Sequence, residues 1–457
     1  MTTPMPLSRR HLLQTLSCGF GYTAFASLAA EAARAADKPQ VEQSPTAPRP
    51  SHFPARAKRV IFLFMRGGPS QMDTFDYKPE LNKNHGKEYG KKDTLFGSPW
   101  KFKQRGESGL WVSDLFPHLA QCADDLCVIR SMQTDSSAHP LAMPQMHTGS
   151  FQFTRPSIGS WVLYGLGTEN QDLPGFITIN PSRVFGGPAN FGSAFLPAAY
   201  QGARIGWEGR SLKDASFQNM RNEKLPRGVQ RAQLDMLQNL NASYDESSVE
   251  GLIDSFELGA RMQDVAPKVM DLSDESRETL KMYGVDEKQT DNFGRQCLLA
   301  RRFVEAGVRF IELGHGSWDH HRNLESGLKR TCGATDQPIA ALLKDLKQRG
   351  LLDETLVVWA GEFGRLPQVQ YETGRGHNAD GFTVWMAGGG TRGGYAHGAT
   401  DEFGRKAVAD PVHLHDLHAT MLHLLGLDHE QLTYRYGGRD FRLTDVHGKV
   451  VSPIIAS

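Results

Sequence analysis

The stretch RVIFLFM at residues 59–65, followed directly by RGGP at 66–69, decides the fold class of this chain. Its apolar run lacks polar alternation, which is typical of a strand buried on both faces, and the Gly-Gly-Pro tripeptide ends it. Similar short runs recur at 126–130, 176–179, 308–313, 355–359 and 382–387, with helical spacing at 295–306 and 339–348. Strands that alternate with such helices predict an α/β fold: a doubly wound, mostly parallel sheet flanked by helices.

The N-terminal residues 1–35 have the features of a twin-arginine signal peptide. Arg9 and Arg10 precede a mildly apolar stretch at 16–30, and Ala33-Arg34-Ala35 offers a cleavage site for signal peptidase. The alternative is a membrane anchor, but a span needs about 20 apolar residues, more than this stretch supplies. We therefore expect a protein that is exported in the folded state and is periplasmic or secreted.

The rest of the chain divides into a linker and one large domain. Residues 36–56 are rich in Pro, with Gln and Ser, and predict a flexible linker. Residues 57–450 are numerous enough for a single α/β domain. A more polar segment at about 205–290 predicts a helical insertion into that domain, which could cover a site or form a partner surface.

The composition narrows the classes of partner. Lys+Arg and Asp+Glu are balanced at 51 each, so no basic surface indicates a nucleic-acid partner. No second apolar run approaches the length of a membrane span. The spacing of the four cysteines beyond residue 35 fits neither a zinc knuckle nor a dense disulfide framework. The oligomeric state stays open.

Side chains that bind metals or transfer protons gather just after the predicted strands. Ligands of a doubly wound sheet bind beyond the carboxyl ends of its strands. The candidates there are Ser70, Asp73, Asp76, Asp135, Ser136, Ser137, His139, His147, His315, Asp319, His320, His321, Glu362, Arg365, Arg375 and His377. Imidazole and carboxylate donors suit a divalent ion, so the sequence predicts a metal site on this rim. Each loop alone could instead be a solvated, hydrogen-bonded surface.

Two further motifs have a structural interpretation beside the functional one. Gly388-Gly389-Gly390 could cradle an oxyanion with backbone N–H groups, or it could form a turn. Asp416 and His418 lie in the segment HLHDLH at 413–418, where they could cap and pack the helix that follows.

Several motifs together resemble a known family over roughly residues 55 to 450. They are RGGPSQMDTFD at 66–76, WDHH at 318–321, GEFGR at 361–365, GGG at 388–390 and TDEFG at 400–404. They resemble the domain-of-unknown-function 1501 family, a sulfatase-like group. The resemblance implies the fold of the alkaline phosphatase superfamily, whose enzymes hold two divalent ions with a nucleophile between them at a helix N-terminus.

The resemblance also implies roles for single residues. In the sulfatases and nucleotide pyrophosphatases of this superfamily, the nucleophile lies ten residues before the Gly of a Thr-Gly pair. The pair resembles Thr148-Gly149 here and places His139 at that position, which departs from the usual Ser, Thr or Cys. One ion would be held by Asp319, His321 and His377, with His315 or His320 as competitors. The second ion would have Glu362 and Asp73 at best, because Arg66 stands where the first-strand Asp is expected.

These expectations combine into a metal-dependent hydrolase of phosphate or sulfate esters, acting outside the cytoplasm. The ion, zinc, calcium or similar, would activate water, and His139 would act as covalent acceptor, general base or additional ligand. Arg66 and Arg365 could clamp an anionic oxygen, although Arg66 could instead pair with Asp73 or Asp76. The substrate would be a small-molecule or polysaccharide ester. The alternative function is a non-catalytic binding protein on a degenerate sulfatase-like scaffold.

Overall fold

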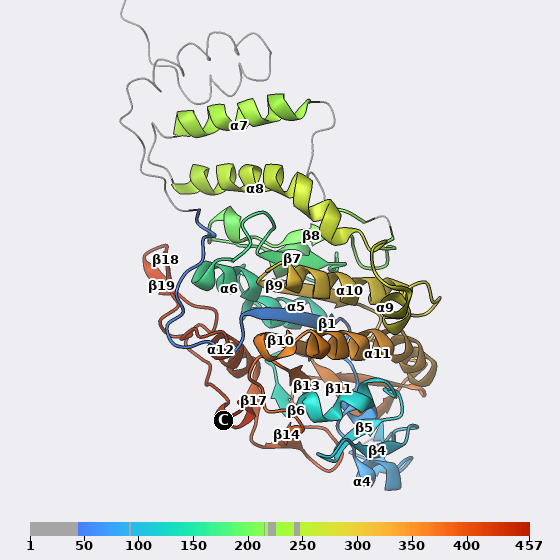
Figure 1. The fold of residues 1–457 in the computed structure, drawn as a ribbon. Coiled ribbons are helices and arrows are strands. Elements are labelled where there is room, and N and C mark those ends of the chain that lie inside the picture. Colours follow the sequence, from blue (N-terminus) through green and yellow to red (C-terminus); the bar gives the residue numbers. More distant parts are fainter. Residues whose placement is uncertain (1–43, 91–92, 214, 218–224, 242–246) are drawn as a thin grey trace, which may run out of the picture.

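A computed structural model describes residues 44–90, 93–213, 215–217, 225–241 and 247–457. Its main feature is a nine-stranded sheet with the order β14-β6-β13-β10-β1-β9-β7-β8, in which β17 also pairs with β6 (Figure 1). The strands are β1 (Arg59–Met65), β6 (Leu126–Gln133), β7 (Phe176–Ile179), β8 (Ala203–Ile205), β9 (Phe310–His315), β10 (Thr355–Ala360), β13 (Phe382–Ala387), β14 (Tyr395–His397) and β17 (Val412–His413). The mostly parallel α/β sheet expected from the sequence is confirmed.

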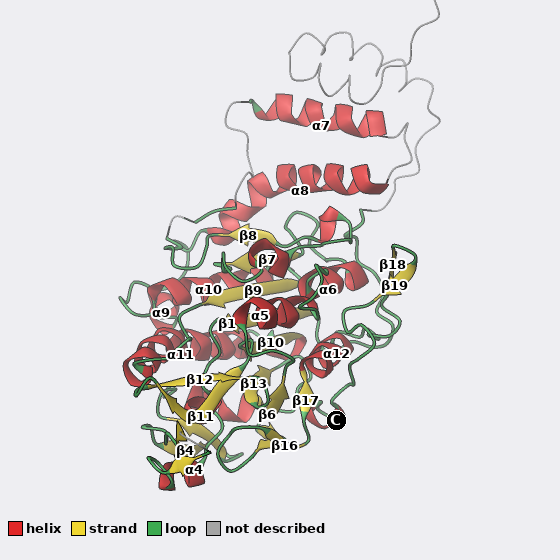
Figure 2. Cartoon of the chain, turned by 180° about the vertical axis from the view of Figure 1, so that it is seen from behind, coloured by secondary structure: helices red, strands yellow, loops and turns green. Residues whose placement is uncertain are grey.

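Helices cover both faces of this sheet. The alternation of β1 explains why, since Ile61 and Leu63 belong to one core and Phe62 and Phe64 to the other. The first core packs against α10 (Asp291–Glu305) and α11 (Leu324–Gln348), and the second against α6 (Ile158–Leu166) and α12 (Leu414–Leu424). Figures 1 and 2 show these two helical layers from opposite sides.

One strand of the sheet runs against the others. β1 is parallel to both β9 and β10, whereas β13 is antiparallel to β10 and to β6. The residues that precede β13 therefore lie at the same edge as those that follow β1, β6, β9 and β10. Gly388-Gly389-Gly390 follows β13 and lies at the opposite edge, where all three glycines have positive φ and Gly389 N–H bonds to Leu352 O at 3.0 Å. This triplet is thus a turn away from the predicted site.

Smaller elements surround the sheet. The hairpin of β11 (Gly364–Gln370) and β12 (Gly374–Asn378) joins β10 to β13. Other short pairs are β2 (Glu88–Tyr89) with β3 (Asp93–Thr94), β4 (Phe102–Arg105) with β5 (Leu110–Ser113), β15 (Ala399–Thr400) with β16 (Ala407–Ala409), and β18 (Tyr434–Tyr436) with β19 (Arg439–Phe441). Three helices, α3 (Gln71–Thr74), α4 (Pro79–Lys83) and α5 (His139–Thr148), follow β1 or β6 in the chain.

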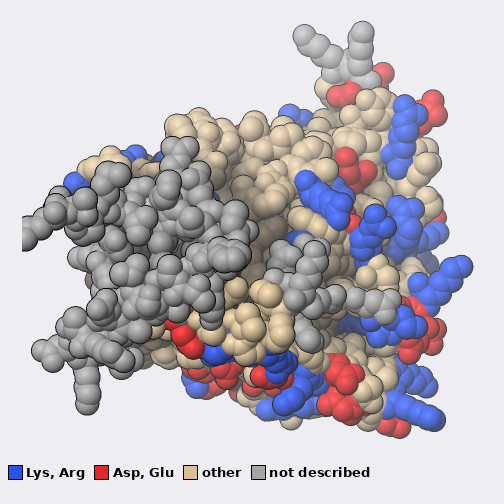
Figure 3. All heavy atoms as spheres, turned by 90° about the horizontal axis from the view of Figure 1, so that it is seen from above, with Lys and Arg blue, Asp and Glu red and all other residues tan. Residues whose placement is uncertain are grey.

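The predicted insertion is helical where the structure describes it. It contains α7 (Arg227–Asn241), α8 (Ser247–Met270) and α9 (Arg277–Met282), and α7 and α8 lie side by side at one end of the molecule (Figures 1 and 2). Among the helices described, none combines the length and apolar character needed to cross a membrane. On the face seen in Figure 3, acidic and basic side chains are intermingled where described atoms are visible.

The predicted signal peptide and the start of the predicted linker lie outside the described residues. From Ser44 onward the linker segment is tied to the domain, because Arg49 N–H donates to Leu166 O and Arg56 N–H donates to Leu424 O, both at 2.9 Å. The Arg49 guanidinium also lies 5.6 Å from the ring centre of Tyr164. This part of the segment therefore packs along α6 and α12.

Candidate metal centre

The candidate site lies at the sheet edge where β1, β6, β9 and β10 end. The loops there approach each other so closely that the loop after β1 requires glycine at positions 67 and 68. A Cβ on Gly67, whose φ is +119°, would lie 2.5 Å from Asp319 N, and one on Gly68 would lie 2.7 Å from the ring of Phe363. The RGGP motif thus lets the loop after β1 pack directly against the loop that carries Asp319.

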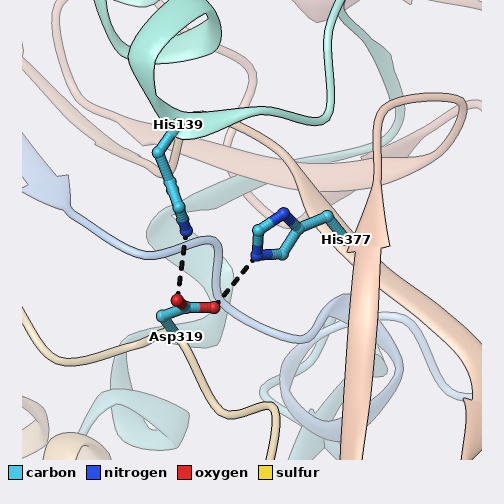
Figure 4. Close-up of side chains that lie close together, drawn as sticks. All are labelled: His139, Asp319 and His377. Atoms are coloured by element: carbon cyan, nitrogen blue, oxygen red, sulfur yellow. Dashed lines mark hydrogen bonds and ion pairs between the residues drawn. The ribbon is translucent and has the colours of Figure 1, made fainter. Parts of the chain in front are cut away.

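The Asp319 carboxylate is the centre of the site (Figure 4). Its Oδ1 accepts a hydrogen bond from Arg365 Nη2 at 2.6 Å, and the Nε2 atoms of His377 and His321 lie 3.0 and 2.9 Å away. Its Oδ2 lies 3.2 Å from His139 Nε2. Asp319 comes from the loop after β9, His139 begins α5 after β6, and His377 lies on β12 just before the antiparallel β13. Three imidazole rings and one guanidinium therefore converge on a single carboxylate.

A second carboxylate orients His139 from behind. Glu362 is fully buried, accepts the Gly67 N–H at 2.9 and 3.1 Å, and lies 2.6 Å from His139 Nδ1. Because an ionised carboxylate only accepts, His139 Nδ1 carries a proton and donates it to Glu362, while Nε2 is directed toward Asp319. Rings of Phe185 and Phe363 lie 5.4 and 4.8 Å from the His139 ring and restrict its movement.

The electrostatics of the cluster follow from these contacts. Burial opposes protonation of His139, but the neighbouring Asp319 and Glu362 carboxylates outweigh it and raise its pKa to about 9. Burial would raise the pKa of Asp319, yet its contacts to His139, His377 and Arg365 hold that pKa far below the usual range. Burial lowers the pKa of His377. In the absence of an ion, a proton on His139 therefore partly neutralises the two carboxylates.

The residues present fit a divalent ion. His139, Asp319 and His377 each offer one ligand atom, and these atoms lie within 4.8 Å of one another. His139 Nε2 is buried and has no well-aligned hydrogen-bond partner among the described residues, although Asp319 is near. Two imidazole nitrogens and a carboxylate oxygen are a usual donor set for zinc and related ions. A carboxylate behind a ligating histidine, as Glu362 is here, is the usual outer partner of such sites.

The other predicted ligands have different surroundings. His321 joins the cluster through Asp319, and its Nδ1 lies 2.5 Å from Gln370 Oε1. Asp73, on α3, is fully buried in an ion pair with Arg375, with Nε–Oδ2 at 2.8 Å and Nη2–Oδ1 at 3.2 Å. Asp73 Oδ2 also accepts the hydroxyl of Ser70 at 2.5 Å. Its carboxylate is thus committed to Arg375 and Ser70 in this structure.

The two arginines predicted to clamp an anion are engaged with protein groups. Arg365 is 1% exposed and donates to the carbonyl oxygens of Gly67, Gly68, Trp318 and Arg375 as well as to Asp319. Arg365 thus connects the loops after β1 and β9 to the β11–β12 hairpin. These contacts favour a positioning role for Arg365.

Arg66 forms a two-pronged ion pair that the sequence did not indicate. Its Nε and Nη2 donate to the two carboxylate oxygens of Glu208 at 2.7 and 2.5 Å. Burial lowers the pKa of Arg66, but the contact to Glu208 prevails and raises it. The expected alternatives, Asp73 and Asp76, are not its partners.

The two competing histidines point elsewhere. His315 Nδ1 accepts the indole N–H of Trp318 at 3.0 Å, and burial lowers its pKa to about 4. Burial likewise lowers the pKa of His320 to about 4. Both rings are therefore neutral near pH 7, and neither belongs to the group of converging ligand atoms within the described chain.

Sequence reasoning missed two contacts that shape the site, one from the Phe185 ring and one from the backbone carbonyl of Ser137. Phe185 stacks on His139 with an interplanar angle of 14°, although its φ of +53° is unusual for a bulky residue. The Ser137 carbonyl lies 2.7 Å from His377 Nδ1, so it fixes the tautomer of that ring. A loop aromatic and a backbone carbonyl carry no recognisable sequence signal, so only the structure could find them.

The chain was also compared with known proteins. Solved structures similar to it include Ps i-CgsB in complex with k-i-k-neocarrahexaose (12% identity, 81% of this chain and 72% of that chain, TM-score 0.39). Others are the PsFucS1 sulfatase from Pseudoalteromonas sp. (13%, 82% and 69%, TM-score 0.37) and the alkaline phosphatase from the Antarctic bacterium TAB5 (12%, 73% and 92%, TM-score 0.30). At these identities the likeness concerns the fold alone.

The sequence comparisons give the family. A search of curated proteins found no match to this chain. A family model described as "Protein of unknown function (DUF1501)" matches residues 57–455, nearly the whole described domain. The chain belongs to the DUF1501 family.

Proposed function

We propose that this protein is an exported, metal-dependent hydrolase of phosphate or sulfate esters. The observation that carries the proposal is the convergence of His139, His377 and Asp319 on one point, with the buried Glu362 orienting His139. The signal-like residues 1–35 support export by the twin-arginine route, with the ion acquired before transport.

In this proposal His139, Asp319 and His377 hold the ion, with His321 beside them. A bound divalent ion supplies Lewis-acid polarisation of an ester oxygen. The chain supplies the rest. Glu362 keeps the His139 proton on Nδ1, the Ser137 carbonyl does the same for His377, and Arg365 holds the Asp319 loop in place. The protein groups are thus fixed before substrate arrives, so little reorganisation is needed during the reaction.

Metal analysis and activity measurements test the proposal. Protein purified without chelator should contain about one divalent ion per chain. It should hydrolyse a chromogenic phosphate or sulfate ester, and His139→Ala and His377→Ala should each lose both the ion and the activity. Arg155→Gln is a matched control, because Arg155 lies over Phe441 of the β18–β19 hairpin, apart from β11 and β12 (Figures 1 and 2). Protein that repeatedly contains no ion, or activity untouched by both histidine variants, contradicts the proposal.

A specific observation favours a second candidate, the non-catalytic binding protein. Arg365 and Arg66 are committed to protein partners, and a histidine stands at the position where the superfamily has a nucleophilic hydroxyl or thiol. In that case the protein would hold its ion and bind inorganic sulfate or phosphate in a metal-dependent manner, but turn over neither class of ester. Turnover that disappears with His377→Ala rules this candidate out.

A further inference from the structure

A row of five aromatic rings passes through the candidate metal centre. Successive ring centres lie 5.4 Å apart for Phe185 and His139, 4.5 Å for His139 and His377, 4.5 Å for His377 and His321, and 6.5 Å for His321 and Tyr371. No other pair of these five rings is in ring contact. The rings therefore form an extended row, with the Asp319 cluster in its middle part and an aromatic side chain at each end.

An exposed arginine lies next to each end of this row. The Arg322 guanidinium lies 4.5 Å from the ring centre of Tyr371, and that ring is 56% exposed. Arg183 precedes Phe185 by two residues, so their Cα atoms are at most about 7 Å apart. The Arg183 guanidinium lies 4.8 Å from the ring centre of Trp207, and the same indole carries Arg204 at 3.9 Å.

Neither of the two arginines is neutralised by the described part of the chain. No carboxylate described lies within ion-pair distance of Arg183 or Arg322, whereas nearby Arg66 and Arg365 are both paired. Stacking on an aromatic ring orients a guanidinium and leaves its N–H donors free for an anion. Burial lowers the pKa of Arg204, and repulsion from Arg183 lowers it further, so positive charge accumulates around Trp207.

The segments that hold these two guanidinium groups in place are packed against the Asp319 cluster. On one side, Glu208 follows Trp207 directly and pairs with Arg66 at the end of β1. On the other, the β11–β12 hairpin packs on the segment after Asp319, because a Cβ on Gly374 would lie 2.1 Å from the His321 backbone. Both guanidinium groups thus belong to the frame of the candidate site and are not attached to independent loops.

We propose that Arg183 and Arg322 bind anionic groups on either side of the group held at the cluster, so that the substrate is a polyanionic chain bearing repeated sulfate or phosphate esters. Four successive ring-to-ring steps of 4.5–6.5 Å connect Phe185 to Tyr371, and an anionic polymer lying along this row presents charges at both ends. Guanidinium groups bind sulfate and phosphate through the same paired N–H donors. The structure therefore assigns a polyanionic substrate and does not distinguish sulfate from phosphate. This inference rests on the proposed function for the reaction at the centre, but the binding itself requires no turnover.

Binding of paired polymers tests the inference. Dextran sulfate and polyphosphate serve as anionic probes, and unmodified dextran is the neutral probe with the same backbone as the first. Wild-type protein should bind at least one anionic probe in a salt-dependent manner and should not bind dextran. The better of the two anionic probes indicates whether sulfate or phosphate is preferred.

Arginine variants locate the binding. Arg183→Gln and Arg322→Gln should each weaken binding by about three- to tenfold, and the double variant by the product of the two factors. Arg155→Gln should leave the affinity unchanged, because Arg155 stacks on an aromatic ring in the same way but away from the row. Both site variants should retain the wild-type metal content.

The possible outcomes separate this inference from the proposed function. Protein without a metal ion that still binds polyanions through both arginines would contradict the hydrolase and leave the inference intact. Wild-type affinity in the double variant, or equal loss in Arg155→Gln, would overturn the inference even if small esters are hydrolysed. Equal binding of dextran and dextran sulfate would overturn it as well.

Discussion

The substitution Glu362→Gln tests whether a buried carboxylate sets up the metal site without binding the ion. Glu362 is fully buried, and its oxygens lie 2.6 Å from His139 Nδ1 and 2.9 and 3.1 Å from Gly67 N. Glutamine preserves the shape of the side chain but keeps only one oxygen. Its NH₂ group is a donor and therefore lies opposite one of the N–H donors that the lost oxygen had accepted. We expect a free energy of unfolding lower by about 1–3 kcal/mol.

The effect on metal binding is the more specific part of this prediction. Loss of an outer partner of a ligating histidine typically weakens metal affinity by about 10–100-fold, equivalent to about 1.4–2.7 kcal/mol. Asp319→Asn removes a proposed ligand itself and should weaken affinity further. Affinity for Zn²⁺ is measured by competition with a chromophoric chelator, alongside urea denaturation of the same samples.

Asp73→Asn is the matched control, since Asp73 is an equally buried carboxylate in the Arg375 ion pair. It should cost about 3–5 kcal/mol of stability because Arg375 loses its partner, while the affinity of the folded protein for Zn²⁺ stays at the wild-type value. Wild-type affinity in Glu362→Gln would refute the placement of His139 as a ligand oriented by Glu362. A stronger loss in Asp73→Asn than in Glu362→Gln would restore Asp73 as a ligand.

Three further predictions concern protons and packing. Because the ion-free His139 has a pKa of about 9, metal binding at pH 7.5 should release about one proton, and the metal affinity should rise about tenfold per pH unit up to pH 9. Calorimetry in buffers of different ionisation enthalpy measures the proton release. A metal affinity that does not change between pH 7 and pH 9 would contradict this prediction. Burial lowers the pKa of His147, yet the Glu312 carboxylate 3.3 Å away prevails and raises it. This pair therefore stabilises the fold fully below pH ~6.5 and less as the pH rises through the folded-state pKa of His147. In urea denaturation, His147→Gln should be more destabilising at pH 6 than at pH 9, and the opposite order would refute the pairing. Gly67→Ala should lower the free energy of unfolding by at least about 1–2 kcal/mol, because position 67 has a positive φ. It should also lower the metal affinity, because the added Cβ would displace the loop that carries Asp319. Unchanged metal binding would show that this close approach is unimportant.

Strand positions could be predicted from the sequence, but the direction of one strand could not. Unbroken apolar runs such as Arg59–Met65 identify buried strands because both faces of the sheet are covered. An unbroken apolar run carries no information about strand direction, however, so nothing in residues 382–387 indicated that β13 is antiparallel. That reversal is what brings His377 to the carboxyl edge of the parallel strands.

The predicted helix at 339–348 is the end of a longer one. α11 begins at Leu324, and its first part contains Gly327, Gly333 and Pro338, which are weak helix formers. Tertiary packing outweighs these weak local preferences, since Leu328 and Cys332 are fully buried in the core.

The gathering of the candidate metal ligands was predictable to a greater extent than the contacts that hold them in place. His139, Asp319 and His377 belong to residue types that bind metals and follow or precede strands, so their gathering could be expected from topology. The partner of Arg66 could not be found in this way, because Glu208 is 142 residues away in a segment predicted to be an insertion. Long-range ion pairs of this kind depend on three-dimensional packing that local patterns do not contain.

The charges around Asp319 connect the proposed metal binding to the proposed kind of substrate. Without an ion, Asp319 and Glu362 are negative, Arg365 is positive, and His139 holds a proton at neutral pH. These four charges cancel. A divalent ion that replaces the His139 proton leaves one net positive charge in a partly buried site, where charges are weakly screened.

An anionic ester therefore gains from the loaded cluster an attraction that the ion-free cluster does not offer. Arg183 and Arg322 extend the same sign of charge along the row of rings, and neither is paired with a described carboxylate. A neutral ester would gain from none of these charges. The ion would thus decide both whether an ester reacts and whether an anionic chain is held in place, and this favours polyanions over small neutral esters at every step from encounter to reaction.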